Sequence, residues 1–240
     1  MAPERVVILG LGPSLEAYTD VTKRLGSKRA LADEVWGINA LGDIIQCDRV
    51  FHMDDVRVQE ARAQANPSGN IAEMLTWMKT YPGPIYTSVP HPDYPGLVPF
   101  PLEDVMNSCG GVAYFNSTAA YAVAYAVHLG VKKLYLFGID FTFPSAHQAE
   151  RGRGCVEFYL GMGKARGMTI GLPSGTSLMD GIATVDERIY GYDGMTIETD
   201  ADEDGLVRVT MTPRPLPSAE VIEERYDHRN HPNPLVKSSS

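Results

Sequence analysis

The chain has 240 residues, of which 44% are hydrophobic and 21% charged, and its formal net charge is −9. This length suits one domain with at most a small appendage, and it is enough to bury a sizeable core. The acidic balance argues against broad electrostatic binding to nucleic acid or acidic membranes, although it does not exclude a local basic patch.

The cysteines and the N-terminus give the expected compartment. Cys47, Cys109 and Cys155 are far apart and form no Cys-x-x-Cys pair, which is typical of a reducing environment. The first residues lack the charged start and cleavage pattern of a signal peptide, and no stretch approaches the length of a membrane span. We therefore expect a soluble, cytoplasmic protein.

The first half of the chain alternates between strand and helix patterns. A buried strand over Arg5–Leu9 enters a glycine-rich turn, and a helix is expected over residues 13–25. Further strands are expected over residues 34–39, 49–53 and 84–89, with a helix over 71–81. Residues 90–111 are rich in proline and glycine and predict a long structureless connection, a feature that is often functional.

The second half begins with the most informative segment. An alanine-rich helix, capped at Asn116 or Ser117 and ended by Gly130, leads into an apolar strand that finishes at Gly138-Ile139-Asp140. That strand is too continuously apolar to be buried on one face only, which predicts a parallel sheet. A loop over residues 141–154, a helix over 155–165 and a strand over 168–172 should follow.

The C-terminal part predicts a hairpin and a tail. Residues 195–199 and 206–211 flank a turn sequence, and the residues after 212 are proline-rich and polar. We predict an α/β fold, Rossmann-like, with a mostly parallel sheet, helices on both faces and a small C-terminal β-hairpin. One nucleotide-binding transferase domain is expected over residues 1–211, hairpin included, with an extended or disordered tail over 212–240.

Ligands of parallel sheets bind at the carboxyl ends of the strands, which singles out Asp140 and Asn39. A carboxylate at position 140 could hold a ribose hydroxyl, a base amine or a metal, or it could cap the following turn. The Asn39 amide could contact both donor and acceptor groups of a nucleotide, or simply serve a turn.

The loop Gly10-Leu11-Gly12-Pro13-Ser14 has two interpretations. Free N–H groups at a helix start attract anions, so the loop could hold a phosphate. It could equally be a tight strand-to-helix turn. Leu15 replaces the third glycine of the dinucleotide fingerprint, and no Gly-Lys-Ser/Thr ending is present, so neither that site nor a P-loop is supported.

Several short motifs resemble the bacterial sialyltransferases of glycosyltransferase family 42 and the related DUF115 group, which includes 6-hydroxymethylpterin diphosphokinases. The motifs cover most of residues 5–180. The matching residues are Gly12 to Leu15, Asn39, Leu129-Gly130, Gly138 to Phe141, His147 before Val156-Glu157-Phe158, and Pro173 to Leu178.

This resemblance implies a nucleotide-dependent transferase, most specifically a glycosyltransferase that uses a nucleotide-sugar donor. His147 would deprotonate an acceptor hydroxyl. The loops over 90–111 and 141–154 would exclude water. The nucleotide would be bound by Gly12, Pro13, Ser14, Asn39, Asn116, Ser117 and Asp140. The chain departs from the sialyltransferases in having Leu11 before Gly-Pro-Ser instead of asparagine, and only Tyr159 and Tyr190 are loose candidates for their paired phosphate-binding tyrosines.

Other charged residues suggest further roles. Arg151 and Arg153 could close over phosphates, or be solvated. Asp54 and Asp55 could bind Mg²⁺ in an ATP-dependent diphosphokinase on the same fold, or cap the next helix. The glycosyltransferase reading requires no cofactor. A non-catalytic nucleotide-binding module is a third alternative.

The partners follow from the preferred interpretation. The donor would be a nucleotide-activated molecule, and the acceptor could be a glycan, a small metabolite or a nucleic-acid base. Relatives in the families that the chain resembles often assemble into tetramers, so a homo-oligomer is an expectation of that resemblance.

Overall fold

The computed structural model describes residues 2–142, 146–181, 183, 188–192, 194–202 and 206–224. The chain divides into two compact units, Met1–Ile182 and Ala183–Ser240. Among the described residues, no helix combines the length and the apolar character needed to cross a membrane.

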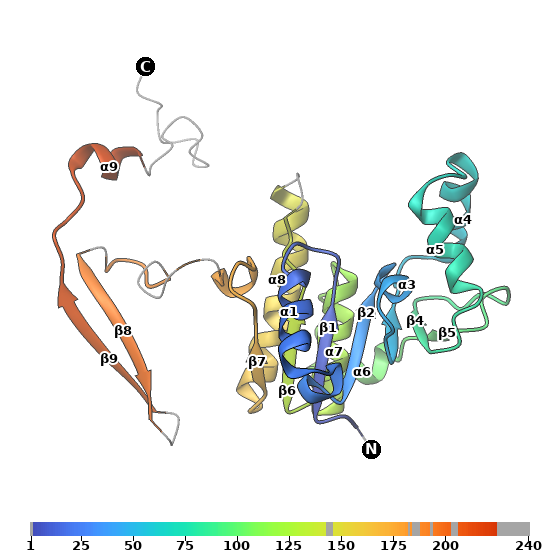
Figure 1. Cartoon of the computed structure of the whole chain (residues 1–240), viewed down its shortest axis with the longest axis horizontal. Coiled ribbons are helices and arrows are strands. Elements are labelled where there is room, and N and C mark those ends of the chain that lie inside the picture. Colours follow the sequence, from blue (N-terminus) through green and yellow to red (C-terminus); the bar gives the residue numbers. More distant parts are fainter. Residues whose placement is uncertain are drawn as a thin grey trace. The chain divides into compact units, whose positions relative to one another are not determined.

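The first unit contains a seven-stranded sheet in the order β5-β4-β3-β2-β1-β6-β7, which Figure 1 shows across the unit. Every neighbouring pair runs in parallel. The predicted α/β fold with a parallel sheet is therefore confirmed. The strands are β1 (Arg5–Leu9), β2 (Glu34–Ile38), β3 (Arg49–Phe51), β4 (Ile85–Thr87), β5 (Leu97–Pro99), β6 (Lys133–Phe137) and β7 (Thr169–Gly171).

One face of the sheet is covered by α6 (Leu102–Ser108), α7 (Thr118–Leu129) and α8 (Ala146–Ala165). The alanines of α7 are buried, and their small side chains allow the helix to lie close to the central strands. Ser117 accepts a hydrogen bond from the N–H of Ala120, and Gly130 ends the helix with a left-handed φ of 70°. Both predicted ends of this helix are thus confirmed.

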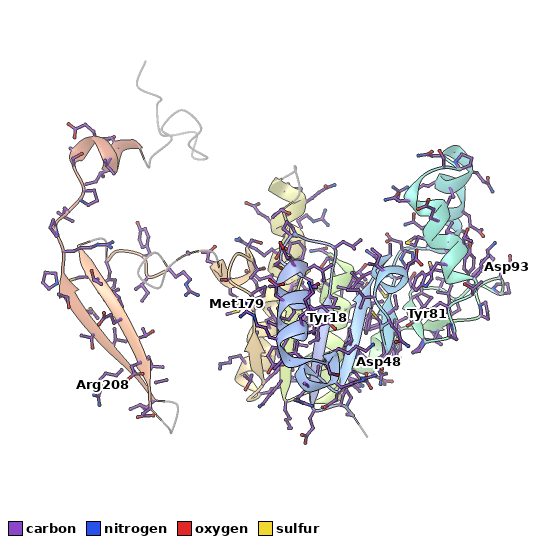
Figure 2. The ribbon with its side chains drawn as sticks, in the orientation of Figure 1. Tyr18, Asp48, Tyr81, Asp93, Met179 and Arg208 are labelled. Carbon is purple, nitrogen blue, oxygen red and sulfur yellow. The ribbon has the colours of Figure 1, made fainter. Side chains whose placement is uncertain are left out.

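Between β1 and β4 the chain forms five helices, α1 (Leu15–Leu25), α2 (Lys28–Leu31), α3 (Leu41–Ile44), α4 (Val56–Ala65) and α5 (Asn70–Met78). Buried side chains of α1, α3, α4 and α5 join the odd-numbered residues of β1 in a second core cluster. Tyr18 of α1, labelled in Figure 2, packs its ring 5.8 Å from that of Phe137. Helices therefore cover both faces of the sheet, as predicted.

The segment 90–111 was predicted to be structureless, and this is wrong. It contributes the edge strand β5 and the helix α6. Leu97, Phe100 and Val105 are buried in the two core clusters. Burial of these apolar side chains outweighs the proline and glycine content of the segment.

The loop predicted over 141–154 is also wrong where the structure describes it beyond residue 145, because α8 already begins at Ala146. Its glycines are points of close approach. A Cβ on Gly152 would lie 2.4 Å from Cε1 of Phe141, and a Cβ on Gly154 would lie 2.7 Å from the Tyr114 hydroxyl. Glycine at positions 152 and 154 therefore reflects tertiary packing, which a local pattern cannot reveal.

The second unit contains the predicted hairpin, formed by β8 (Met195–Ala201) and β9 (Val207–Pro213) in antiparallel register. Side chains on β9, such as the labelled Arg208, are exposed (Figure 2). The tail over 212–240 was expected to be extended or disordered, and within it the structure describes a short helix, α9 (Ala219–Glu224). By its contacts the hairpin belongs to the second unit, whereas the domain boundary at 211, with the hairpin folding as part of the first domain, stays a prediction.

Candidate functional site

A crevice of about 910 Å³ opens at the carboxyl ends of the central strands in the first unit. It is lined by the residues that follow β1, β2 and β6 and by the starts of α7 and α8. The strand order reverses at β1, because β2 lies on one side of it and β6 on the other. This is the switch point at which open α/β sheets bind their ligands.

Ser14 and Asp140 join the loops after β1 and β6, and we call this pair the Ser14–Asp140 clamp. The Ser14 N–H donates to Asp140 Oδ2 at 2.7 Å, and the Ser14 hydroxyl donates to Asp140 Oδ1 at 2.6 Å. The same hydroxyl accepts from the N–H of Gly138 at 2.8 Å. Asp140 is 3% exposed. The two predicted site residues, 126 positions apart, therefore meet in one place.

The clamp changes the interpretation of the glycine loop. The carboxylate of Asp140 already occupies the anion position at the start of α1, and the Gly12 N–H donates to the carbonyl of Gly138 at 2.8 Å. A Cβ on Gly10 would lie 2.3 Å from that carbonyl oxygen, and a Cβ on Gly12 would lie 2.6 Å from Asp140 Oδ2. The glycines thus serve close backbone packing, which agrees with the tight-turn interpretation.

The start of α7 offers a second anion position in the crevice. Asn116, Ser117, Thr118 and Ala119 line it. The first N–H groups of a helix have no acceptor within the helix, and the helix dipole adds a partial positive charge there. Arg151 lines the same region, and its Nη2 atom lies 3.4 Å from Asn116 Oδ1. Arg151 and Asp140 are the charged residues among the described lining.

The first turns of α8 carry the other predicted residues. His147 is exposed and is not among the lining residues, whereas Gln148, Arg151 and Gly152 are. Residues four apart share a helix face, so His147 lies one helical turn before the lining residue Arg151. Arg153 lies instead 3.6 Å from Glu157, which also accepts the N–H of Met179.

Asn39 lines the crevice from the end of β2. Its φ of 54° is left-handed, a conformation that asparagine tolerates better than most residues. Its N–H donates to the carbonyl of Phe51 at 2.9 Å, while its buried Oδ1 atom has no hydrogen-bond partner.

Asp54 and Asp55 do not form a metal site with neighbouring ligands. Asp55 caps α4 by accepting the N–H of Arg57, and it also pairs with the Arg57 guanidinium. That guanidinium lowers the pKa of the Asp55 carboxyl. Across the described part of the chain, no group of three or more His, Cys, Asp or Glu side chains could hold a metal ion. Asp55 is thus engaged as a helix cap, as one of its two interpretations expects, and the Mg²⁺ alternative stays a prediction.

Several lining residues were not predicted as site residues, among them Phe115, Phe141, Thr142 and Gln148. Phe141 has a left-handed φ of 47°, and its ring lies against Gly152 of α8. Its position directly after Asp140 was the available signal. Tyr159, a candidate for phosphate binding, is instead buried against Phe115 with its hydroxyl donating to the Val112 carbonyl, and burial raises its pKa to about 12.

No protein-family model matches the chain, and neither does any curated protein. Solved structures of sialyltransferase CstII are similar. CstII from Campylobacter jejuni in complex with CMP-3FNeuAc is 18% identical, over 91% of this chain and 97% of that one, with a TM-score of 0.45. Its complex with cytidine-5'-monophosphate is 17% identical, over 92% of this chain and 98% of that one, with a TM-score of 0.44. CST-II in complex with a trisaccharide acceptor and CMP is 16% identical, over 91% of this chain and 97% of that one, with a TM-score of 0.44.

Proposed function

We propose that this protein is a nucleotide-dependent transferase, most specifically a glycosyltransferase that moves a sugar from a nucleotide-sugar donor to an acceptor hydroxyl. The observation that carries this proposal is the crevice at the switch point of the sheet, which is lined by the start of α7, by Arg151 and by Asp140 of the Ser14–Asp140 clamp. The volume of about 910 Å³ suits a nucleotide conjugate.

The phosphate of the donor is assigned to the start of α7. The start of α1 is already neutralised by Asp140, so it has little attraction left for a second anion. At α7 the free backbone N–H groups and the Arg151 guanidinium are close together, as the contact between Arg151 and Asn116 requires. A guanidinium binds phosphate oxygens through charge-assisted hydrogen bonds.

The nucleoside is assigned to the part of the crevice between the clamp and Asn39. The backbone from Gly10 to Pro13 approaches closely there because glycines carry no Cβ, and Phe115 and Phe141 also line the crevice. Asn39 and Asp140 supply polar contacts for a base or a ribose.

His147 is proposed as the general base. It accepts the proton of the acceptor hydroxyl as the oxygen attacks the anomeric carbon of the donor sugar. The bond between that carbon and the phosphate oxygen breaks, and the nucleotide leaves with the electron pair. Arg151 and the start of α7 stabilise the charge that develops on the departing phosphate. This step requires no metal, and the acceptor class remains open among glycans, small metabolites and nucleic-acid bases.

Nucleotide binding tests the assignment of the phosphate. Thermal shifts would be measured with CMP, UMP, GDP, ATP and their available sugar conjugates, because a ligand that binds the native state raises its melting temperature. We expect Arg151→Ala to weaken binding of the best nucleotide at least tenfold. Arg153→Ala is the matched control, since Arg153 pairs with Glu157. If no nucleotide shifts the wild type, or both variants behave alike, the proposal fails.

The base is tested separately. His147→Ala should reduce turnover about a hundredfold or more while nucleotide affinity stays within a factor of two. Unchanged turnover would remove the assignment. Assays with and without EDTA distinguish the reaction from a Mg²⁺-dependent diphosphokinase, which would lose its activity on chelation.

A further inference from the structure

Three neighbouring strands carry unpartnered polar atoms at their carboxyl ends. In the described part of the chain, the buried side-chain nitrogen and oxygen atoms without a hydrogen-bond partner are Asn39 Oδ1, His52 Nδ1, His52 Nε2 and Thr87 Oγ1. His52 is 2% exposed and Thr87 is 0% exposed. We call Asn39, His52 and Thr87 the polar row.

The strand register places these residues side by side. Ile38 of β2 pairs with Phe51 of β3, and Phe51 pairs with Tyr86 of β4. Each member of the polar row directly follows one of these three residues. The backbone ladder continues through the row, because Asn39 N–H donates to the Phe51 carbonyl and His52 N–H to the Tyr86 carbonyl.

The same register places two of the side chains on one face of the sheet. His52 and Thr87 lie two residues beyond Val50 and Ile85, which belong to the second core cluster, so alternation puts both on that face.

The unpaired polar atoms of this row reduce the stability of the fold if they serve packing alone. A buried polar atom without a partner keeps its full desolvation cost, which apolar side chains of the same size would avoid. Unsatisfied buried groups in a native structure call for a ligand, a water or a catalytic role. Asn39 lines the crevice, so the row begins where the nucleotide site ends.

The chemistry of the row defines what it can bind. It offers an amide oxygen, a hydroxyl and an imidazole. Burial lowers the pKa of His52, so the ring favours its neutral form, although the charge of the nearby Asp54 acts to raise that pKa. A neutral imidazole has one donor and one acceptor nitrogen. None of the three side chains provides a positive charge for a phosphate or a carboxylate. Alternating donors and acceptors without charge match hydroxyl groups.

We infer that the polar row is a subsite for a neutral, hydroxyl-bearing sugar unit, directly beside the nucleotide crevice. The inference rests on the proposed function for the identity of its neighbour, and it adds His52 and Thr87 to the substrate-binding residues. Adjacent strands are about 4.8 Å apart, so the row is about 10 Å long, which matches one pyranose ring with its substituents. Because His52 and Thr87 are covered, the segments after β3 and β4 must shift when the sugar enters.

The test uses the full chain with ¹⁵N-labelled histidine. The imidazole signals of His52, assigned with His52→Gln, are followed while galactose or N-acetylglucosamine is added. A second arm adds UDP, UDP-galactose or UDP-N-acetylglucosamine. We expect at least one sugar to move the His52 signals. Movement by the free sugar identifies an acceptor subsite, and movement by the conjugate but not by UDP identifies the donor sugar.

Thr87→Val supplies the decisive variant, because it keeps the shape of the side chain and removes an unpartnered hydroxyl. Its melting temperature should be no lower than that of the wild type, while the sugar Kd should rise at least tenfold and the nucleotide Kd should change less than twofold. Thr176→Val is the matched stability control. Thr176 is also buried, but its hydroxyl donates to the Ile139 carbonyl, so this variant should melt at a lower temperature.

Two results overturn the inference: no sugar or conjugate moves the His52 signals, or Thr87→Val binds the sugar as tightly as the wild type. The nucleotide titration separates this from the proposed function. Nucleotide binding without any sugar effect defeats the subsite alone. Sugar effects without nucleotide binding defeat the proposed nucleotide function and leave the subsite standing.

Discussion

The two halves of the sheet's carboxyl edge differ in whether their buried polar side chains are hydrogen-bonded. On the β1–β6 half, the Ser14–Asp140 clamp and the Gly138 N–H satisfy one another within hydrogen bonds of 2.6–2.8 Å. On the β2–β4 half, the polar row leaves four buried side-chain atoms without partners. Both halves lie at the ends of parallel strands, where ligands bind.

This difference assigns the two halves different tasks. The clamp holds the loops of the crevice in place and fills the anion position at the start of α1, so the proposed phosphate position is the start of α7. The remaining lone pairs of the Asp140 carboxylate are left for a ribose or a base. An unpaired buried group is costly until something binds it, so a neutral polar ligand in the proposed subsite would remove that cost.

The largest effect is expected where the clamp brings two backbones together. Gly138→Ala should lower the free energy of unfolding by more than about 3 kcal/mol, because a Cβ would lie 2.1 Å from the Gly10 carbonyl oxygen and φ is 68°. Urea denaturation measures this loss.

Gly130→Ala is the matched control for that variant. Its φ of 70° is nearly the same, but a Cβ there would meet nothing within 4 Å. It should cost only about 1–2 kcal/mol, the strain of a left-handed residue with a side chain. Equal losses at the two positions would show that close approach of the loops is unimportant.

A smaller effect is expected from the hydroxyl at the centre of the clamp. Ser14→Ala removes the donor to Asp140 and the acceptor for Gly138 N–H, so it should cost about 2–3 kcal/mol in denaturant unfolding. Ser27→Ala, which removes an exposed cap of α2, should cost about 1 kcal/mol or less. If Ser14→Ala were no worse than its control, the clamp would not be a paired unit.

The smallest effect concerns pH and the polar row. Burial lowers the pKa of His52 below its ordinary value of 6.5. The unfolded chain therefore binds a proton at a higher pH than the folded chain, so stability is retained above pH 6.5 and falls as the pH drops below it. Between pH 7.5 and 5.5, the free energy of unfolding of the wild type should therefore fall more than that of His52→Gln. Parallel pH curves for the two proteins would contradict a buried neutral imidazole.

Local patterns predicted much of the fold. The strand Arg5–Leu9, the hairpin and both ends of the alanine-rich helix were predicted from apolar runs, turn residues and caps. Segments rich in glycine and proline were predicted wrongly. Gly152 and Gly154 indicated a loop by composition, yet both lie in α8. They are glycines because Phe141 and Tyr114 leave no room for a side chain at these positions.

The candidate site was predictable in part for a similar reason. Asp140, Asn39 and the start of α7 follow from the rule that parallel sheets bind ligands at their carboxyl ends. The hydrogen bonds between Ser14 and Asp140 join residues 126 positions apart, so no local pattern reveals that the anion position of α1 is filled. His52 lay in a segment interpreted for its acidic neighbours, and its lack of partners is a property of the packed sheet.

By itself, the sequence determined many of the elements and the edge of the sheet where ligands are expected, because propensity, caps and apolar periodicity act over a few residues. The tertiary structure decided which polar groups at that edge are already paired and which are not. Pairing depends on strand order and register, which bring together residues far apart in the chain, and it is pairing that separates the clamp from the polar row.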